Sequence, residues 1–212
     1  DYFGRLNADV AILQEVGGIP DWARERYQCT ESRPITKNGN PQRFASVTLV
    51  RGLVEETFRL FSPRDWLHDE FHRFSGNLTG VRATVLSRSL HIVNVYSPAW
   101  PVARERWIEK DVADVKTRTN PDLWVTDLLY HALANRQLDG EWIVAGDFNS
   151  CLTFDKWKHR PAGFDSNQET QDRMRSLGLA EALSEQRGMV PTFRRPGKLL
   201  PHCQLDYVWM SR

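Results

Sequence analysis

The sequence predicts an α/β or α+β sandwich built around a largely antiparallel sheet. Two observations carry this prediction. Short apolar runs typical of strands interleave with helical stretches, and two of these runs flank a short polar turn as the arms of a hairpin do. Hairpins join antiparallel strands, whereas parallel strands need long crossovers. Because no repeat and no Gly/Ser-rich linker divides the chain, we expect residues 1–212 to form one domain.

The expected elements follow from local patterns along the chain. Strands are predicted where short runs are apolar or rich in β-branched residues, at 10–13, 44–50, 79–86, 90–96, 142–145 and 205–210. Residues 87–89 are the predicted hairpin turn, and residues 35–42 a turn-rich loop. Helices are predicted at 20–26, 121–135 and 168–177.

Composition and charge exclude several classes of protein. The longest apolar runs have four residues, whereas a membrane-spanning helix needs about 20, so we expect no membrane partner. With 28 Lys and Arg against 27 Asp and Glu, a nucleic-acid partner would require a local basic patch. The 3 cysteines form no disulfide framework or zinc pair, which predicts reduced thiols and a cytoplasmic location.

Three acidic residues share one context, the end of a buried strand pattern. Glu15 follows the run at 10–13, Asp147 follows 142–145, and Asp206 lies in 205–210. Burying several carboxylates together is unfavourable unless a cation neutralises them. Mg²⁺ prefers one or two carboxylates with water and phosphate oxygens. The pattern therefore predicts a divalent-metal site, and the alternative is that each carboxylate forms a separate cap or ion pair.

Two further motifs place polar groups at strand ends. Asp147 and Asn149 are two residues apart, so extended backbone would point both side chains to one side. There the carboxylate can take a proton from water, while the amide donates to a phosphoryl oxygen or holds the carboxylate. Tyr96 ends another strand pattern and can donate to an anionic oxygen. The alternative is a buried tyrosine whose hydroxyl is satisfied internally.

Four motifs together resemble the endonuclease/exonuclease/phosphatase superfamily, which includes apurinic endonucleases, DNase I-like nucleases, sphingomyelinases and inositol-polyphosphate 5-phosphatases. In chain order they are Leu13-Gln14-Glu15, Asn94-Val95-Tyr96-Ser97-Pro98, Gly146-Asp147-Phe148-Asn149 and Leu205-Asp206-Tyr207. The resemblance extends from Ala8 to Ser211. It implies a DNase I-like, four-layered α/β/β/α sandwich, with two mostly antiparallel sheets between helices and the site at one edge.

The resemblance also implies a function and residue roles. The implied activity is Mg²⁺-dependent hydrolysis of phosphodiesters, with Mn²⁺ as a substitute metal. Glu15 matches the metal-binding glutamate, and Tyr96 matches a residue that supports the transition state at the phosphate. Asp147 matches the residue that activates or orients the attacking water, and Asn149 matches its partner at the scissile phosphate. Asp206 matches the aspartate that orients a catalytic histidine.

The sequence departs from the superfamily pattern at both ends and at one internal position. Members carry an asparagine on a strand before the first helix and a Ser-Asp-His motif after the Leu-Asp-Tyr segment. This chain starts after the first feature and ends before the second. We therefore expect both ends to be cut from a longer domain, and this piece alone to be poorly active or inactive. Ala99 stands where several nucleases of the superfamily have asparagine.

Cations and aromatic residues follow three of the strand ends, where the loops of a cleft should lie. Cations contact phosphates and tryptophan stacks on bases, so these segments favour a nucleic-acid substrate. The alternative is solvated loops with Trp157 packed inward. The predicted substrate-binding residues are Trp100, Lys156, Trp157, Arg160 and Arg194, and the same segments hold Arg104, Arg106, Arg195 and Lys198.

The sequence thus favours a Mg²⁺-dependent nuclease acting on DNA or RNA. Two alternatives stay open. One is a phosphatase or phosphodiesterase of the same fold that acts on inositol phosphates or lipids. The other is a catalytically silent binding domain that kept the cleft. The sequence supports no inference about a stable protein partner.

Overall fold

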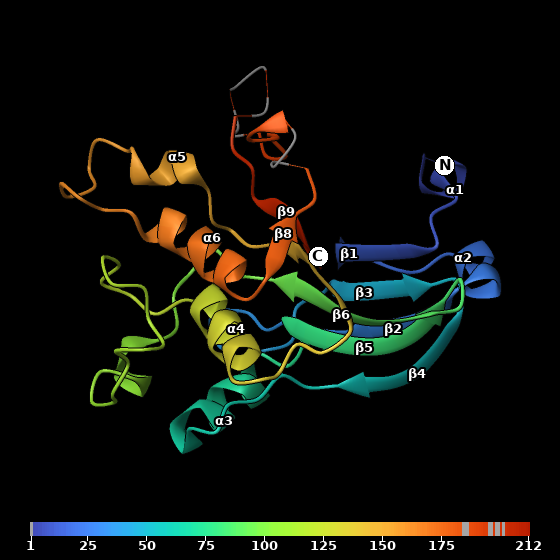
Figure 1. Ribbon diagram of the computed structural model, residues 1–212, viewed down its shortest axis with the longest axis horizontal. Helices are drawn as coiled ribbons and strands as arrows, with labels where there is room; N and C mark the ends of the chain where they lie inside the picture. The colour runs from blue at the N-terminus through green and yellow to red at the C-terminus, as the bar shows by residue number, and fades with distance from the viewer. Residues whose placement is uncertain (1, 184–186, 195–196, 198–199, 201) are drawn as a thin grey trace.

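The computed structural model describes residues 2–183, 187–194, 197, 200 and 202–212 (Figure 1). The strands are β1 (Val10–Val16), β2 (Gln28–Ser32), β3 (Ala45–Val50), β4 (Leu53–Phe58), β5 (Leu78–Val85), β6 (Arg88–Tyr96), β7 (Glu141–Asp147), β8 (Leu179–Glu181) and β9 (Asp206–Ser211). The helices are α1 (Tyr2–Leu6), α2 (Asp21–Arg26), α3 (Asp65–Arg73), α4 (Val125–Ala134), α5 (Leu152–Asp155) and α6 (Ser166–Ser176), with a 3₁₀ turn at Arg104–Arg106. The predicted Arg195 and Lys198 lie outside the described residues.

The strands of the described ranges form two sheets. One has three strands in the order β1-β3-β2, and the other has six in the order β4-β5-β6-β7-β9-β8. Strands β6 and β7 run parallel, and the other pairs between these strands are antiparallel. The chain crosses from β6 to β7 through α4, as parallel pairing requires. The predicted sandwich of mostly antiparallel sheets is confirmed.

Three apolar clusters define the layers. The first, which includes Ala23 and Val47, lies between α2 and the three-stranded sheet. The second joins Val50 of β3 to Ile92 of β6 and fills the space between the two sheets. The third and largest packs α3, α4 and α6 against the far face of the six-stranded sheet. In Figure 1 these three helices gather on the left and α2 lies on the right, so helices flank the paired sheets.

The alternation of side chains along β3 explains its position as the middle strand of its sheet. Val47 and Leu49 face α2, whereas Thr48 and Val50 face the six-stranded sheet. All six residues of β3 are buried. A strand covered on both faces needs apolar or hydrogen-bonded side chains at every position. Its sequence, Ala-Ser-Val-Thr-Leu-Val, meets that requirement.

Two of the predicted boundaries were wrong. The β5–β6 turn consists of Leu86 and Ser87 alone, and both have positive φ, 47° and 66°. This tight two-residue turn suits the twist of a hairpin better than the expected turn at 87–89. The helix predicted from Pro121 starts at Val125. The Asp127 carboxylate accepts the backbone N–H of Trp124 at 2.8 Å, and this bond fixes the start of the helix.

Several elements carry no clear sequence signal, because they are short or polar. Strand β4 contains Glu55 and Glu56, which break an apolar pattern. Both carboxylates pair with Arg82 of β5 instead, at 2.7 and 3.1 Å. Helix α3 presents its apolar side to the core through Leu67 and Phe71. Tertiary contacts therefore determine the secondary structure of these segments, and local propensity does not.

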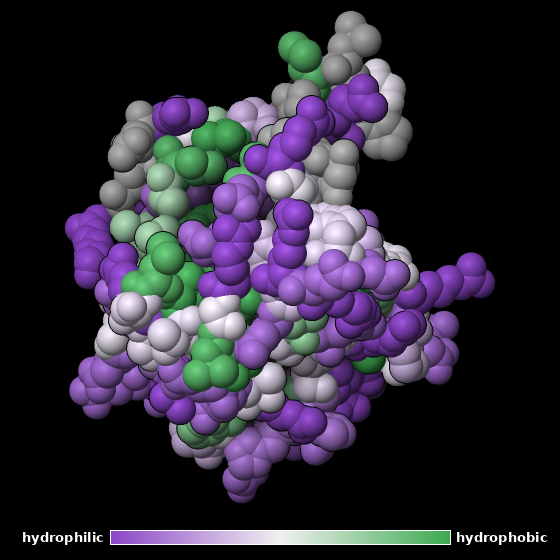
Figure 2. Space-filling view, turned by 90° about the vertical axis from the view of Figure 1, so that its right-hand side faces the viewer, coloured by the Kyte–Doolittle hydropathy of each residue, from purple (hydrophilic) through white to green (hydrophobic). Residues whose placement is uncertain are grey.

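The surface is mainly hydrophilic on the face that Figure 2 presents. Apolar side chains gather there in a band on one side, and hydrophilic ones cover most of the rest. Among the described helices, none is both long and apolar enough to cross a bilayer.

A glycine fixes the close approach of β6 and β7. Gly146 has φ +133°, and a Cβ atom there would lie 2.1 Å from the Val95 carbonyl oxygen and 2.7 Å from the Gln14 amide nitrogen. We expect Gly146→Ala to lower the free energy of unfolding by about 3 kcal/mol or more, because the backbone itself must move. Urea denaturation followed by circular dichroism measures this change.

The matched control is Gly17→Ala, since a Cβ atom at Gly17 would meet nothing within 4 Å. We expect its free energy of unfolding to stay within about 1 kcal/mol of the parent chain. Equal stability of the two variants would contradict the packing described for β6 and β7.

Candidate active site

Strand register places three of the predicted site residues side by side. Tyr96 at the end of β6 pairs with Asp147 at the end of β7, and Asp147 pairs with Asp206 at the start of β9. Directly paired residues point to the same face of a sheet. Three polar side chains from distant parts of the sequence therefore lie in a row at one edge of the six-stranded sheet.

Glu15 joins this row from the other sheet. The β1–β3 register shifts between Leu13 and Val16, which is a bulge, and Glu15 adopts φ +57° within it. A non-glycine residue in this region is uncommon and is often found at functional sites. The bulge turns the carboxylate toward Tyr96, whose hydroxyl donates to Glu15 Oε1 at 3.1 Å. This bond links the two sheets at the site.

Asn149 meets Asp147 through a turn and not through extended backbone, so the predicted geometry was wrong. Asn149 has φ +46°. Its backbone N–H donates to Asp147 Oδ1 at 2.8 Å, and its side-chain Nδ2 donates to Asp147 Oδ2 at 3.2 Å. The same Nδ2 donates to the Ser97 carbonyl oxygen at 2.6 Å. Both oxygens of the Asp147 carboxylate are thereby held in place, as in other Asx turns.

These residues line one cavity of about 610 Å³. Glu15, Tyr96, Asp147, Asn149 and Asp206 all contribute to its wall. The remaining walls are mostly apolar or aromatic, and they consist of Gln14, Ala99, Trp100, Phe154, Trp157, Phe193 and Leu205. The structure thus brings together all five residues for which the sequence predicted catalytic or metal-binding roles.

Two titratable groups in the cavity have displaced pKa values. Burial is the main cause that raises the pKa of Asp147 to about 7; the hydrogen bond from Asn149 opposes this rise, and the nearby charges of Asp206 and Glu15 contribute to it. Burial also raises the pKa of Tyr96 above its usual range, and the Glu15 charge acts in the same direction. The phenol therefore keeps its proton at neutral pH and serves as a hydrogen-bond donor.

Two amide side chains form hydrogen bonds that connect the two sheets next to the site, and sequence reasoning gave them no role. Gln14 Nε2 donates to Asn94 Oδ1 at 2.9 Å, and Asn94 Nδ2 donates to the Val47 carbonyl oxygen at 3.1 Å. Asn94 is fully buried between the sheets. Both residues belong to the motifs that carry the resemblance, but a single sequence gives no signal that separates a bridging amide from a structural one.

The predicted substrate-binding residues fall into two groups. Trp100 and Trp157 line the cavity, and Trp157 also packs on Phe154 with ring centroids 4.4 Å apart. Arg160 lines a neighbouring cavity. Lys156 and Arg194 are exposed and line neither cavity.

Arg106 lies in one of the predicted cationic segments but has a structural contact instead. Its guanidinium pairs with Glu70, a residue of α3 that is 1% exposed. A charge this deeply buried requires its partner. The pair therefore anchors the loop after β6 to the helical layer.

The site offers hard oxygen donors for a cation. Within the described ranges no group of three His, Cys, Asp or Glu side chains is close enough to hold a metal by itself. The Glu15 carboxylate accepts one hydrogen bond through Oε1, and Asp147 and Asp206 repel each other electrostatically. This donor set fits Mg²⁺, which takes few protein carboxylates and completes its shell with water and phosphate. Asp206 makes no side-chain hydrogen bond to any described histidine.

Comparisons with known proteins agree with the fold. The chain is similar to an endonuclease/exonuclease/phosphatase family protein from Leptotrichia buccalis, with TM-score 0.57 and 12% identity over 100% of this chain and 78% of that one. It is similar to the catalytic domain of Xenopus laevis APE2, with TM-score 0.62 and 16% identity over 100% and 76%. This chain has the endonuclease/exonuclease/phosphatase fold. The predicted resemblance is thus confirmed at the level of the fold.

A third structure with this fold contains DNA. It is the 3′ phosphatase NExo from Neisseria bound to a product DNA hairpin, with TM-score 0.54 and 14% identity over 96% of this chain and 76% of that one. No protein-family model and no curated protein sequence matches the chain. The likeness is therefore structural, and sequence divergence is large.

The raised pKa of Asp147 predicts a pH-dependent stability. A carboxyl whose pKa rises from 3.8 to about 7 on folding stabilises the protein while protonated, and this contribution is lost as the pH rises through about 7. The Asp147→Asn variant has no such contribution to lose, because an amide side chain does not titrate in this pH range. Without divalent metal, we expect the stability of this variant relative to the parent to improve by about 1–3 kcal/mol between about pH 5 and pH 8.

Urea denaturation at both pH values measures the difference. The control is Asp69→Asn, because Asp69 is an exposed carboxylate on α3. Its stability relative to the parent should change little across the same range. An Asp147→Asn variant that behaves like this control would contradict the burial described for Asp147.

Proposed function

We propose that this protein is a metal-dependent phosphodiester hydrolase of nuclease type. The observation that carries the proposal is the single cavity lined by Glu15, Tyr96, Asp147, Asn149 and Asp206. Hydrolysis of a phosphodiester needs a positioned water, stabilisation of charge on the phosphoryl oxygens and help for the leaving alkoxide. The side chains of the cavity provide candidates for each of these tasks.

Glu15 is the residue proposed to hold Mg²⁺, with water and substrate phosphate as further ligands. When bound, the metal supplies a Lewis acid that polarises and orients the phosphate. The exposed Glu15 carboxylate faces the cavity and is fixed by the Tyr96 hydroxyl. Binding of a cation also offsets the mutual repulsion of the carboxylates that raises the pKa of Asp147.

The other residues act on water and phosphate. Asp147 is held through both oxygens by Asn149 and takes the role of orienting the attacking water or accepting its proton. Tyr96 keeps its proton, and when substrate is bound its hydroxyl turns from Glu15 to donate to developing negative charge. Asp206 lies beside Asp147 and is the proposed partner of a histidine that assists proton transfer.

Nucleic acid is the proposed substrate class. Trp100 and Trp157 line the same cavity as the acidic residues, and aromatic rings stack on bases of any sequence. The DNA-bound Neisseria enzyme supports this choice because the same fold accommodates a DNA product. The alternatives, inositol phosphates and lipid phosphates, have no base to stack on these rings.

A substrate panel tests the proposal. We expect Mg²⁺ or Mn²⁺ to bind the chain and to promote slow cleavage of plasmid DNA, abasic DNA or RNA, but not of inositol or lipid phosphates. Asp147→Ala should reduce cleavage by about 10²- to 10⁴-fold, the usual contribution of a positioned base. Calorimetry measures metal binding, and gel electrophoresis measures cleavage. A chain that binds neither metal nor nucleic acid would disprove the proposal.

The Tyr96 hydroxyl provides a finer test. Tyr96→Phe keeps the ring, which packs edge-on against Phe44 at 5.6 Å, and removes the donor to Glu15. We expect the turnover rate to fall by about 10- to 100-fold, because one donor to developing charge is lost, and metal affinity to weaken. The control is Tyr130→Phe, since Tyr130 lies on α4 outside the cavity. Equal turnover of the two variants would contradict the role given to Tyr96.

A further inference from the structure

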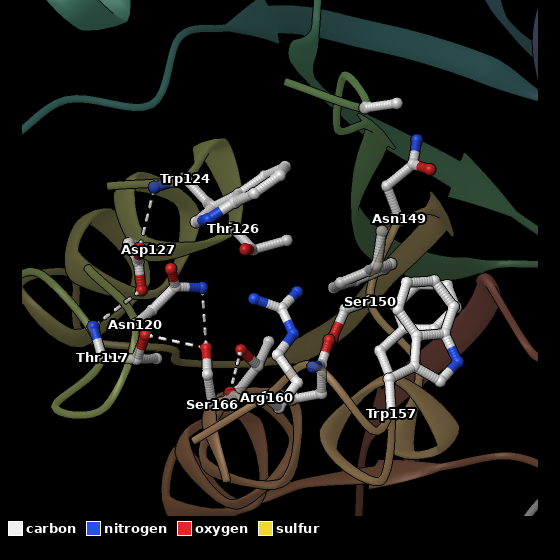
Figure 3. Close-up of a pocket in the computed structure, with 15 residues that line it drawn as sticks. Thr117, Asn120, Trp124, Thr126, Asp127, Asn149, Ser150, Trp157, Arg160 and Ser166 are labelled. Carbon is white, nitrogen blue, oxygen red and sulfur yellow. Dashed lines mark hydrogen bonds between the residues drawn. The ribbon is translucent and has the colours of Figure 1, made fainter. Parts of the chain in front are cut away.

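A second cavity of about 240 Å³ adjoins the candidate active site (Figure 3). It lies between the start of α4, the start of α6 and the segment that follows β7. Ala99, Asn149, Phe154 and Trp157 line both cavities, so the two lie next to each other. A molecule bound by its phosphate at Asn149 can therefore place a neighbouring group in the second cavity.

Two hydrogen-bond donors in this cavity have no partner. Arg160 Nε and Trp124 Nε1 are buried, and the described part of the chain offers neither of them an acceptor. Figure 3 shows the Arg160 guanidinium in the middle of the cavity, between Trp124 and Trp157. Buried donors are almost always satisfied by protein, water or ligand. Such a pair, one of them charged, favours a ligand that carries hydrogen-bond acceptors.

Several of the cavity's acceptors are already in use. The Asp127 carboxylate accepts the backbone N–H groups of Thr117 and Trp124 at 3.1 and 2.8 Å. The Ser166 hydroxyl is 3.1 Å from the amide nitrogen of Asn120 and 3.0 Å from the Thr117 hydroxyl. Figure 3 shows these bonds along one side of the cavity. The buried groups that have no partner are the two donors, and these favour the carbonyl oxygens of a ligand over its amino groups.

The walls are rich in aromatic rings. Trp124, Phe148, Phe154 and Trp157 line the cavity together with Arg160, whose guanidinium carbon lies 4.3 Å from the ring centroid of Phe164. Pockets for drug-sized ligands measure roughly 300–1,000 Å³, so this smaller cavity suits a single planar ring system. A bare phosphate would gain nothing from the rings. A nucleobase would gain both the stacking and the two hydrogen bonds.

We propose that this cavity binds one nucleobase of the substrate strand, next to the scissile phosphate, and that it favours bases with carbonyl oxygens. Thymine, uracil, cytosine and guanine carry a carbonyl oxygen, which can accept two hydrogen bonds, whereas each ring nitrogen of adenine accepts only one and its amino group donates. The inference rests on the proposed function, since a base beside the active site implies a nucleic-acid substrate. Arg160 supplies the charged donor, Trp124 the neutral one, and Trp157 separates the base from the phosphate site.

Binding of short single strands to the full chain tests the proposal. The probes are fluorescently labelled hexathymidylate, hexa-adenylate and a hexamer of the same backbone without bases, measured by anisotropy with Ca²⁺ in place of Mg²⁺ to slow cleavage. We expect hexathymidylate to bind about tenfold more tightly than the backbone-only strand, and hexa-adenylate to bind with intermediate affinity.

Variants separate base contacts from phosphate contacts. Arg160→Ala should weaken hexathymidylate binding about tenfold and leave the backbone-only strand unchanged. Trp124→Phe keeps a ring and loses the donor, so it should weaken hexathymidylate binding about fivefold. The control is Arg26→Ala, which removes the same charge from an exposed position on α2. Thermal unfolding establishes that each variant is folded.

The outcomes are distinct. If Arg160→Ala weakens the binding of hexathymidylate and of the backbone-only strand equally, Arg160 contacts phosphate, and the proposal is overturned. If the variant weakens neither, the cavity holds only water, and the proposal is overturned as well. Base-dependent binding without any binding of Mg²⁺ or Mn²⁺ in calorimetry would overturn the proposed function and leave the base site standing. Mg²⁺-dependent cleavage without base-dependent binding would overturn the base site and leave the proposed function standing. Failure of every strand to bind would overturn both.

Discussion

The register between β6, β7 and β9 is the constraint on which the candidate site depends. It sets Tyr96, Asp147 and Asp206 in one row, although they are separated by 51 and 59 residues along the chain. A slip of one residue in either pair would turn one of these side chains to the opposite face. The register is itself specified by the apolar residues that precede the row, because Val93, Val95 and Val144 must face the helical layer.

The candidate site requires unfavourable backbone conformations at two positions. Glu15 and Asn149 are two of the few described non-glycine residues with positive φ, and both line the cavity. Such conformations cost about 1–3 kcal/mol each and persist where surrounding structure holds them. Here the Tyr96 hydroxyl holds Glu15, and Asp147 together with the Ser97 carbonyl group holds Asn149. The polar network therefore stabilises the strained turns that create it.

Much of the fold and the membership of the site could be predicted from the sequence, whereas the geometry could not. Strongly apolar runs such as that of β7 identify buried strands, and motif order identified Glu15, Tyr96, Asp147, Asn149 and Asp206. Positive φ at Glu15 has no local signal, and at Asn149 the only signal is that asparagine tolerates this region better than most residues. Cationic segments were less informative, because charge alone does not separate the half-buried Arg106, which anchors a loop, from the exposed Arg194.

The two sheets meet at the site through very few polar links. The Tyr96 hydroxyl bonds to Glu15, and the Asn94 amide connects Gln14 with the Val47 carbonyl group. Glu15, the residue proposed to bind the metal, thus belongs to one sheet, and Asp147, proposed to orient the water, belongs to the other. Any shear of the sheets would separate the two halves of the candidate site while the hydrogen bonds within each sheet remained intact. The proposed activity would then depend on the alignment of the two sheets, and mild denaturing conditions would abolish it before secondary structure is lost.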